Sequence, residues 1–131
     1  MQPHVKEVII LEGSAKPLAP YSPGIRWNDL VFVSGQIGLD PRTGKLVAGG
    51  VVAETRQALL NLSAILEAAG SSMLHTLKVT VYLKDISDYA IVNQVYAEFF
   101  TDKPPARAIV QGALPAGASV EFDAIAGINQ E

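Results

Sequence analysis

Arg107 is the residue whose surroundings most directly suggest a binding role. It follows residues 104–106, Pro-Pro-Ala, and precedes the apolar run 108–110, at the start of a predicted strand. A guanidinium offers a planar pair of hydrogen-bond donors and stays charged at any working pH, so an arginine among small and apolar neighbours is a candidate anchor for a carboxylate. The same pattern fits a surface or salt-bridged arginine, because charged side chains are mostly exposed.

Glu121 is the candidate proton acceptor. It lies between Val120 and Phe122 in an apolar run, so in a strand its side chain leaves the face opposite these two. A carboxylate placed there beside a bound molecule could act as a general base. The alternative is a solvated carboxylate on the polar side of a strand.

Four other residues could line a pocket beside these charges. Asn93 lies on the apolar side of a predicted helix, where it either presents its amide to a pocket or stands at the edge of the apolar stripe. Ser34 and Gly35 end an apolar strand, and the bare backbone of Gly35 permits close approach of a ligand, although a plain turn explains the pair equally well. Tyr21, in a loop bracketed by prolines, is either a pocket wall or a packed loop aromatic.

Composition excludes several classes of chemistry. The sequence contains no cysteine, and its two histidines, His4 and His75, are too few and too isolated for a metal cage. No Walker A loop, dinucleotide fingerprint or nucleophile motif is present. Ten basic and thirteen acidic residues give a net charge of -3, and the basic residues do not cluster, which argues against a nucleic-acid partner.

Length and hydropathy predict one globular unit, residues 1–131. The 131 residues are 49% apolar and 18% charged, which is typical of a chain that buries a core. The longest stretch without a charge, residues 108–120, has 13 residues, whereas a membrane-spanning helix needs about 20. The first seven residues lack the pattern of a secretory signal. These features predict a cytoplasmic protein without membrane contact.

The first half of the sequence predicts three strands and a long helix. Residues 6–11, 24–27 and 30–34 are apolar runs, and the Asn28-Asp29 dipeptide between the last two favours a hairpin. The proline-containing stretch 13–24 is expected to be a loop. Gly70 is the expected stop of the helix. Apolar positions spaced three and four apart indicate that helix, namely Val52, Thr55, Leu59, Leu62, Leu66 and Ala69.

The second half predicts a strand, a helix and two closing strands. Residues 77–83 alternate between apolar and polar types, so Leu77, Val79, Val81 and Leu83 are expected to face a core. Ser87 is expected to cap the helix, and Pro104-Pro105 to close the segment. The apolar stripe of this helix contains Tyr89, Val92, Tyr96 and Phe99. The runs 106–111 and 119–128 are interpreted as a closing hairpin.

This order of elements predicts an α+β fold, a six-stranded sheet with two helices on one face. Residues 30–33 and 120–125 put apolar side chains on both faces of such a sheet. Because two helices cover one face only, the second face is expected to pack against other copies of the chain in a closed homo-oligomer.

Nearly the whole sequence resembles the Rid family, the reactive intermediate deaminases also called YjgF-like proteins. The matching segments are APYSPG, VFVSGQIGLDPRTGKL, ETRQALLNLSAILEAAG, LKVTVYLKDISDY, VNQVYAEFF, PPARAIV and VEFDAIA. The most specific matches are SGQI followed by the DPRTG turn, and the PAR segment, which carries the family's substrate-binding arginine. Their joint occurrence makes an accidental match very improbable.

The resemblance implies a fold and an activity. The fold would be chorismate-mutase-like, and the assembly a homotrimer with sheets packed around a central barrel and three clefts between adjacent subunits. Arg107 would grip the carboxylate of a 2-imino or 2-enamino acid such as 2-iminobutanoate or 2-iminopropanoate. Glu121 would position the attacking water. The products would be a 2-oxo acid and ammonia, formed without metal or organic cofactor.

The resemblance also implies roles for the remaining candidates. Tyr21, Ser34, Gly35 and Asn93 would line the cleft. Backbone carbonyls near Gly35 or Ile109 would hold the imine nitrogen, by analogy with the family.

The sequence departs from the family pattern at several positions. Ala19, Pro23 and Ile109 replace residues more usual there. The segment between Arg107 and the following Leu-Pro is also one residue shorter than in typical relatives. A one-residue change inverts side-chain facing along a strand unless a bulge absorbs it, and Gly112 is a candidate position for that bulge.

Two alternative functions stay open at this level. The cleft could serve another enamine, such as 2-aminomuconate. Alternatively, the chain could be a non-catalytic RNA-related or chaperone-like binding protein. The acidic balance and the lack of a catalytic histidine argue against RNA cleavage.

Overall fold

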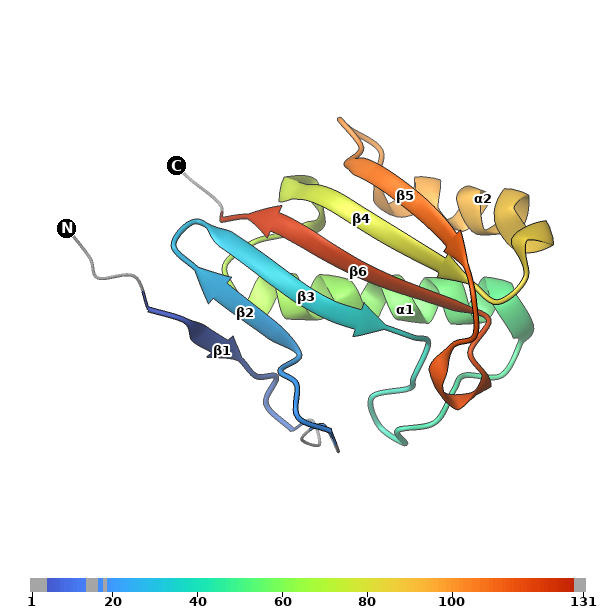
Figure 1. Ribbon diagram of the computed structural model, residues 1–131, viewed down its shortest axis with the longest axis horizontal. Helices are drawn as coiled ribbons and strands as arrows, with labels where there is room; N and C mark the ends of the chain where they lie inside the picture. Colours follow the sequence, from blue (N-terminus) through green and yellow to red (C-terminus); the bar gives the residue numbers. More distant parts are fainter. Residues whose placement is uncertain (1–4, 14–16, 18, 129–131) are drawn as a thin grey trace.

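The computed structural model describes residues 5–13, 17 and 19–128, and it shows one six-stranded sheet with two helices on the same face (Figure 1). The strand order in the sheet is β1-β2-β3-β6-β4-β5. The prediction of an α+β fold with six strands and two helices is confirmed. The strands are β1 Glu7–Ile9, β2 Gly24–Trp27, β3 Leu30–Gln36, β4 Thr76–Leu83, β5 Ala106–Gln111 and β6 Val120–Gly127, and the helices are α1 Gly50–Ala68 and α2 Tyr89–Phe99.

The last strand, β6, lies at the centre of the sheet. It pairs antiparallel with β3 on one side and with β4 on the other, whereas β5 pairs parallel with β4 at the sheet edge. The predicted closing hairpin of residues 106–111 and 119–128 is therefore wrong. The reason is that α2 carries the chain over the sheet to the outer side of β4, and parallel strands require such a crossover.

The hairpin of β2 and β3 is confirmed. Gly24 pairs with Val33 and Trp27 with Leu30, and the turn between them contains Asn28 in the left-handed backbone region with φ 52°. Asparagine tolerates this region because its short polar side chain can bond to the local backbone.

The core lies between the sheet and the helices. α1 buries Thr55, Leu59, Leu62 and Leu66 of the expected stripe, whereas Val52 is only half-buried. α2 adds Val92, Val95 and Tyr96. Gly70, with φ 89°, follows the end of α1 as predicted. The largest fully buried side chains are Phe122, Leu59, Leu62, Leu66, Leu83, Val31, Val79, Val81, Val92, Val120 and Thr55.

Leu77 does not face this core, contrary to the expectation from alternation. The register between β4 and β6 shifts between Thr76 and Lys78, so one extra residue interrupts the period of two. Thr76 is consequently buried, and Leu77 is 54% exposed.

Ser87 does not cap α2 with its side chain. Asp85 accepts a hydrogen bond from the Ser87 backbone N–H at 2.9 Å, and a short 3-10 turn, Ile86–Asp88, precedes the helix. The carboxylate of Asp85 therefore caps this 3-10 turn, and α2 itself begins after Asp88 without a side-chain cap.

Large apolar side chains remain on the sheet face that the helices leave open. By strand register, these include Val8, Trp27, Leu30, Phe32 and Val110, each at least 36% exposed in the single chain. The prediction that apolar residues occupy both faces is confirmed. Within the part of the chain that the structure describes, no helix has the length and apolar character needed to cross a membrane.

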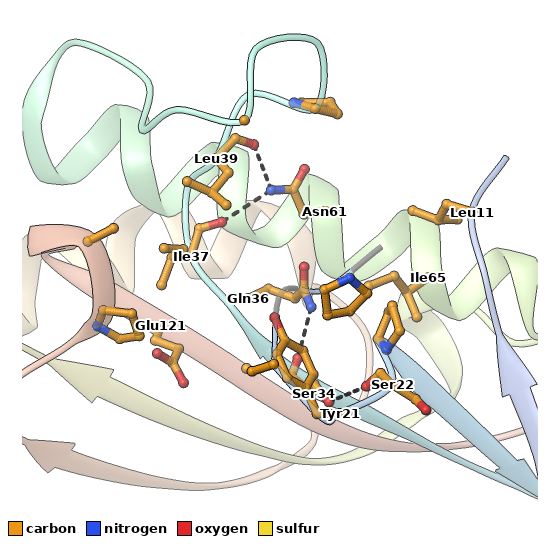
Figure 2. Close-up of a pocket in the computed structure, with 18 of the residues that line it drawn as sticks. Leu11, Tyr21, Ser22, Ser34, Gln36, Ile37, Leu39, Asn61, Ile65 and Glu121 are labelled. Atoms are coloured by element: carbon orange, nitrogen blue, oxygen red, sulfur yellow. Dashed lines mark hydrogen bonds between the residues drawn. The ribbon is translucent and has the colours of Figure 1, made fainter. Parts of the chain in front are cut away.

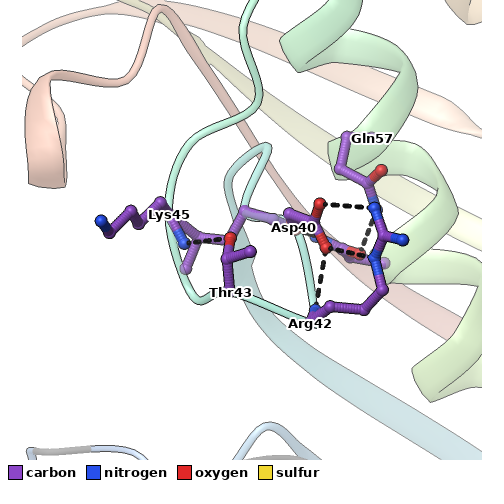
Figure 3. A network of polar contacts seen from close by, with 7 residues as sticks. Asp40, Arg42, Thr43, Lys45 and Gln57 are labelled. Carbon is purple, nitrogen blue, oxygen red and sulfur yellow. Dashed lines mark hydrogen bonds and ion pairs between the residues drawn. The ribbon is translucent and has the colours of Figure 1, made fainter.

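The turn after β3 is held by local polar contacts (Figure 3). The Asp40 carboxylate accepts a hydrogen bond from the Arg42 backbone N–H at 2.8 Å and forms an ion pair with the Arg42 guanidinium at 3.2 Å. On the α1 side, the Asn61 amide donates to the backbone oxygens of Ile37 and Leu39 at 3.1 and 2.9 Å. These bonds fasten the turn to α1 and so shape one wall of the pocket described next.

Candidate active site

Arg107 lies on the edge strand β5 and points toward the helix layer. It is the register partner of Val79, a fully buried residue of β4, so the two side chains leave the same face. Its Nη1 donates a hydrogen bond to Oδ1 of Asn93 on α2 at 2.9 Å. Ile109, two residues further along β5, faces the same side and packs against the core. The structure thus brings three of the predicted site residues together: Arg107, Asn93 and Ile109.

Two tyrosine rings complete the surroundings of the guanidinium. Its central carbon lies 4.8 Å from the ring centroid of Tyr96 and 5.9 Å from that of Tyr89, both within the range of cation–π contact. Tyr89, Asn93 and Tyr96 are spaced four and three residues apart on α2, so they form one stripe along the helix. In residues 5–13, 17 and 19–128, no carboxylate forms an ion pair with Arg107. Its charge is therefore available to an anionic ligand.

Sequence reasoning treated Tyr89 and Tyr96 only as parts of the apolar stripe of α2. Their spacing from Asn93 was a visible signal of one face. This face meets Arg107 only because the crossover through α2 places β5 beside β4. The predicted hairpin of residues 106–111 and 119–128 contained no such crossover.

The other predicted residues surround a separate pocket (Figure 2). Tyr21 comes from the loop before β2, Ser34 and Gly35 from β3, and Glu121 from β6, and all four line a cavity of about 1060 Å³. Its wall beyond these residues is largely apolar, with Leu11, Ile37, Leu39 and Ile65 among the lining side chains.

Ser34 attaches the Tyr21 loop to the sheet. Its hydroxyl donates to the backbone oxygen of Ser22 at 2.6 Å, and its N–H donates to the backbone oxygen of Pro23 at 2.9 Å. Tyr21 itself is 56% exposed and stands at the pocket edge. The serine therefore positions the loop in addition to lining the pocket.

Gly35 leaves room for the close approach of Glu121. A Cβ at Gly35 would lie 2.0 Å from Oε2 of Glu121, a distance that real atoms do not adopt. The bare backbone of Gly35 was expected to permit close approach of a ligand. In the structure this space is occupied by the Glu121 carboxylate. The register of β3 and β6 shifts between Val33 and Gln36, at this same place.

The environment of Glu121 favours its protonated form more than water does. Burial raises the pKa of this carboxyl group above its ordinary value, and the nearby negative charge of Asp123 raises it further. Asp123 accepts a hydrogen bond from the hydroxyl of Tyr82 at 2.9 Å, and Tyr82 is the register partner of Glu121. Asp123 was not among the predicted site residues, although its position two residues after Glu121 places it on the same face.

Glu121 faces away from Val120 and Phe122, as predicted. The candidate bulge at Gly112 does not form, because β5 keeps an unbroken parallel register with β4 through Gln111. In the loop that follows, Ala116 adopts the left-handed backbone region at φ 56°.

The two groups of residues lie on opposite faces of the sheet. Arg107 faces the helices, Glu121 faces the open side, and β4 separates their strands. One small molecule cannot touch both side chains of a single chain. His4 lies outside the described residues, and within them no group of three His, Cys, Asp or Glu side chains could hold a metal ion.

Comparisons with known proteins agree with this fold and identify similar chains. Residues 12–128 match the family model described as endoribonuclease L-PSP. The chain is 49% identical to a RutC family protein of Pyrococcus horikoshii, over 93% of this chain and 98% of that protein. It is 44% identical to the 2-iminobutanoate/2-iminopropanoate deaminase of Mus musculus, over 93% and 91% of the two chains. The crystal structure of E. coli TdcF with bound serine superposes with a TM-score of 0.87 at 36% identity, covering 94% of this chain and 99% of that one.

Proposed function

The chain belongs to the endoribonuclease L-PSP family, the Rid family indicated by its motifs, and on this basis we propose that it is a 2-iminobutanoate/2-iminopropanoate deaminase. It hydrolyses reactive 2-imino acids, and their 2-enamino tautomers, to 2-oxo acids and ammonia. The mouse protein named for this activity shares 44% of its residues over nearly the whole chain. The serine bound in E. coli TdcF is a small molecule with a carboxylate, which supports the same class of ligand.

One observation carries the proposal, the unneutralised charge of Arg107. Two aromatic rings and an amide oxygen surround the guanidinium, and none of these groups cancels its charge. A substrate carboxylate can therefore take the free donors in a planar, two-bonded arrangement. This contact fixes the position of the imine carbon.

Glu121 supplies the proton acceptor. The C=N carbon of the substrate is already electrophilic, so the enzyme has to orient it and to activate water. The carboxylate takes a proton from water as the oxygen attacks C2 and the C=N electron pair moves to nitrogen. Glu121 returns this proton to the nitrogen, which gives a tetrahedral carbinolamine. The hydroxyl proton of the carbinolamine then passes to the nitrogen through the same carboxylate, the C–N bond breaks, and the 2-oxo acid and ammonia leave. A raised pKa makes the Glu121 carboxylate a stronger base than an ordinary carboxylate, which suits it to this proton exchange.

The site is composite, because Arg107 and Glu121 of one chain face opposite sides of the sheet. Arg107, Asn93 and Ile109 of one subunit meet Tyr21, Ser34, Gly35 and Glu121 of the next. The exposed apolar side chains of the open face are buried when three sheets pack around a common axis. The assembly is a homotrimer with three such clefts.

The first experiment measures ammonia release from 2-iminobutanoate generated in situ from threonine by a dehydratase. We expect ammonia to appear faster than by spontaneous hydrolysis at the same pH. Light scattering after gel filtration should give three times the mass of the chain. No acceleration with either 2-iminobutanoate or 2-aminoacrylate would contradict the proposed activity, and a monomer would contradict the composite cleft.

A second experiment tests the composite site directly. Chains carrying Arg107→Ala and chains carrying Glu121→Ala are co-expressed with different tags, and mixed trimers are isolated. If each cleft takes its arginine and its glutamate from different subunits, every isolated mixed trimer regains one of its three clefts, which is about a third of the sites. If both residues came from the same chain, the mixed trimers would be as inactive as the parents.

A further inference from the structure

The hydroxyl group of Tyr96 is buried without a hydrogen bond. Tyr96 is 7% exposed, and within the part of the chain that the structure describes its Oη has no hydrogen-bond partner. Its ring packs against Phe100 in a tilted arrangement with centroids 4.5 Å apart, and it stacks against Phe122 at 6.1 Å. A phenylalanine would fill this core position equally well, and a buried hydroxyl without a partner disfavours folding. The hydroxyl therefore calls for an explanation outside folding.

The charged group beside the Tyr96 ring is the guanidinium of Arg107. The guanidinium carbon lies 4.8 Å from the Tyr96 ring centroid. Burial raises the pKa of the Tyr96 hydroxyl, whereas the charge of Arg107 and the proximity of its N–H donors lower it, although the two groups do not have the geometry of a hydrogen bond in the free chain. In the free chain the guanidinium instead donates from Nη1 to Asn93. Tyr96 thus offers an unused acceptor beside a cation that has unused donors.

We propose that Tyr96 is a positioning residue for Arg107, whose guanidinium donates to Tyr96 Oη when a substrate carboxylate occupies its outer donors. This inference rests on the proposed function, since it requires a carboxylate on Arg107. The ring supports the cation from below, and the hydroxyl oxygen fixes rotation of the guanidinium plane at the moment of binding. The planar fork is then presented to the carboxylate in one orientation.

Tyr96 acts through Arg107 and does not itself touch the substrate. Its Oη is buried inside the chain, so no ligand reaches it. The expected signature is weaker carboxylate binding without a change in the chemical step. A residue that served only the core would change stability instead.

The test compares Tyr96→Phe with Phe100→Leu in the intact protein. Tyr96→Phe keeps the ring and removes the oxygen, so we expect KM for 2-iminobutanoate to rise roughly three- to tenfold, with kcat nearly unchanged. The melting temperature should hold or increase, because an unpartnered hydroxyl is removed. Phe100→Leu disturbs the same ring cluster without contacting Arg107, and it should lower the melting temperature and leave KM unchanged.

Two results would overturn the inference. One is an unchanged KM in Tyr96→Phe, which would show that the hydroxyl is idle. The other is a KM that rises only together with a lower melting temperature in both variants, which would assign Tyr96 to packing.

A binding measurement separates this failure from failure of the proposed function. The product analogue 2-oxobutanoate keeps the carboxylate, and its Kd is measured by calorimetry for the wild-type and Tyr96→Phe proteins. An active wild type with equal Kd values in the two proteins overturns the role of Tyr96 alone. A wild type that neither releases ammonia nor binds 2-oxobutanoate overturns the proposed function and this inference with it. A wild type that binds without turnover, and binds more weakly as Tyr96→Phe, supports the role of Tyr96 and contradicts the reaction.

Discussion

The surroundings of Arg107 and of Glu121 differ in a way that matches two different tasks. Arg107 sits among neutral groups, two aromatic rings and an amide, so its charge stays fully available. Glu121 sits in a partly buried position next to a second acid, so its charged form is disfavoured. A fixed charge suits binding of an anion, whereas a carboxylate with a raised pKa suits proton transfer. Under the proposed function, substrate binding and proton transfer are divided between the two faces of one sheet.

The largest expected effect is the loss of the cation. Arg107→Ala should lower kcat/KM by roughly 30- to 1000-fold, because a charge-assisted pair of hydrogen bonds to the carboxylate is lost. Arg107→Lys should recover little, since an ammonium cannot hold both oxygens in one plane. Steady-state ammonia release measures both values. Wild-type turnover by a folded, trimeric Arg107→Ala protein would contradict the assignment of Arg107 as the group that binds the substrate carboxylate.

Removal of the carboxylate should have the next largest effect. Glu121→Gln keeps the shape of the side chain, and we expect kcat to fall by roughly a hundredfold, at the low end for a general base because the imine is already reactive. The free energy of unfolding should move the other way. A raised folded-state pKa means that the charged carboxylate is disfavoured in the folded chain above its ordinary pKa, so the neutral amide should stabilise the fold at pH 7. Denaturant titration checks the stability; a Glu121→Gln protein with full activity would reassign the proton acceptor.

A smaller effect is expected when Glu121 is moved but not removed. Gly35→Ala introduces a Cβ at the present position of the carboxylate, so the side chain must turn away and kcat/KM should fall by roughly tenfold. The fold should tolerate the change because the contacted atoms are the mobile end of a side chain. Gly112→Ala is the matched control, since a Cβ there meets no atom within 4 Å. Equal activity of the two variants would show that the position of the carboxylate is unimportant.

The smallest expected effect concerns pH. The deprotonated Glu121 is the active form, so kcat/KM should decrease as the pH falls through the raised pKa of this group, at a pH above the ordinary value of 4.5. Asp123→Asn removes the neighbouring negative charge and keeps an acceptor for Tyr82, so the midpoint should move to lower pH. The profile is measured with imine generated in situ and the spontaneous rate subtracted. An identical midpoint in both proteins would exclude Asp123 as an influence on Glu121.

Local patterns predicted most of the elements and the facing of Glu121. Spacings of three and four residues identified α1, and alternation placed Glu121 on the face opposite Phe122. Alternation failed at Leu77, because a register shift beside Thr76 leaves no trace in residue types. A period of two holds only while the ladder stays regular.

Non-local placement was the part that sequence reasoning could not reach. The runs 106–111 and 119–128 are both strands, but their partners depend on which side of β4 the crossover returns. That same choice decides whether Arg107 meets Tyr89 and Tyr96, so the ring contacts followed only from the observed sheet order. The placement of Arg107 and Glu121 on opposite faces could not be predicted either, because it depends on how β5 and β6 are each aligned with β4.

The central position of β6 has a consequence for synthesis of the chain. β6 is the last strand in sequence, yet it joins the β1-β2-β3 group to the β4-β5 pair. Until residues 120–127 have left the ribosome, β3 and β4 each present an unpaired edge, and such edges pair readily with other chains. Formation of the complete sheet must therefore wait until β6 has been synthesised, and contacts between segments distant in sequence form slowly. A chain that ends before residue 120 would contain two partial sheets, and each would expose the strand edge that β6 covers in the complete fold.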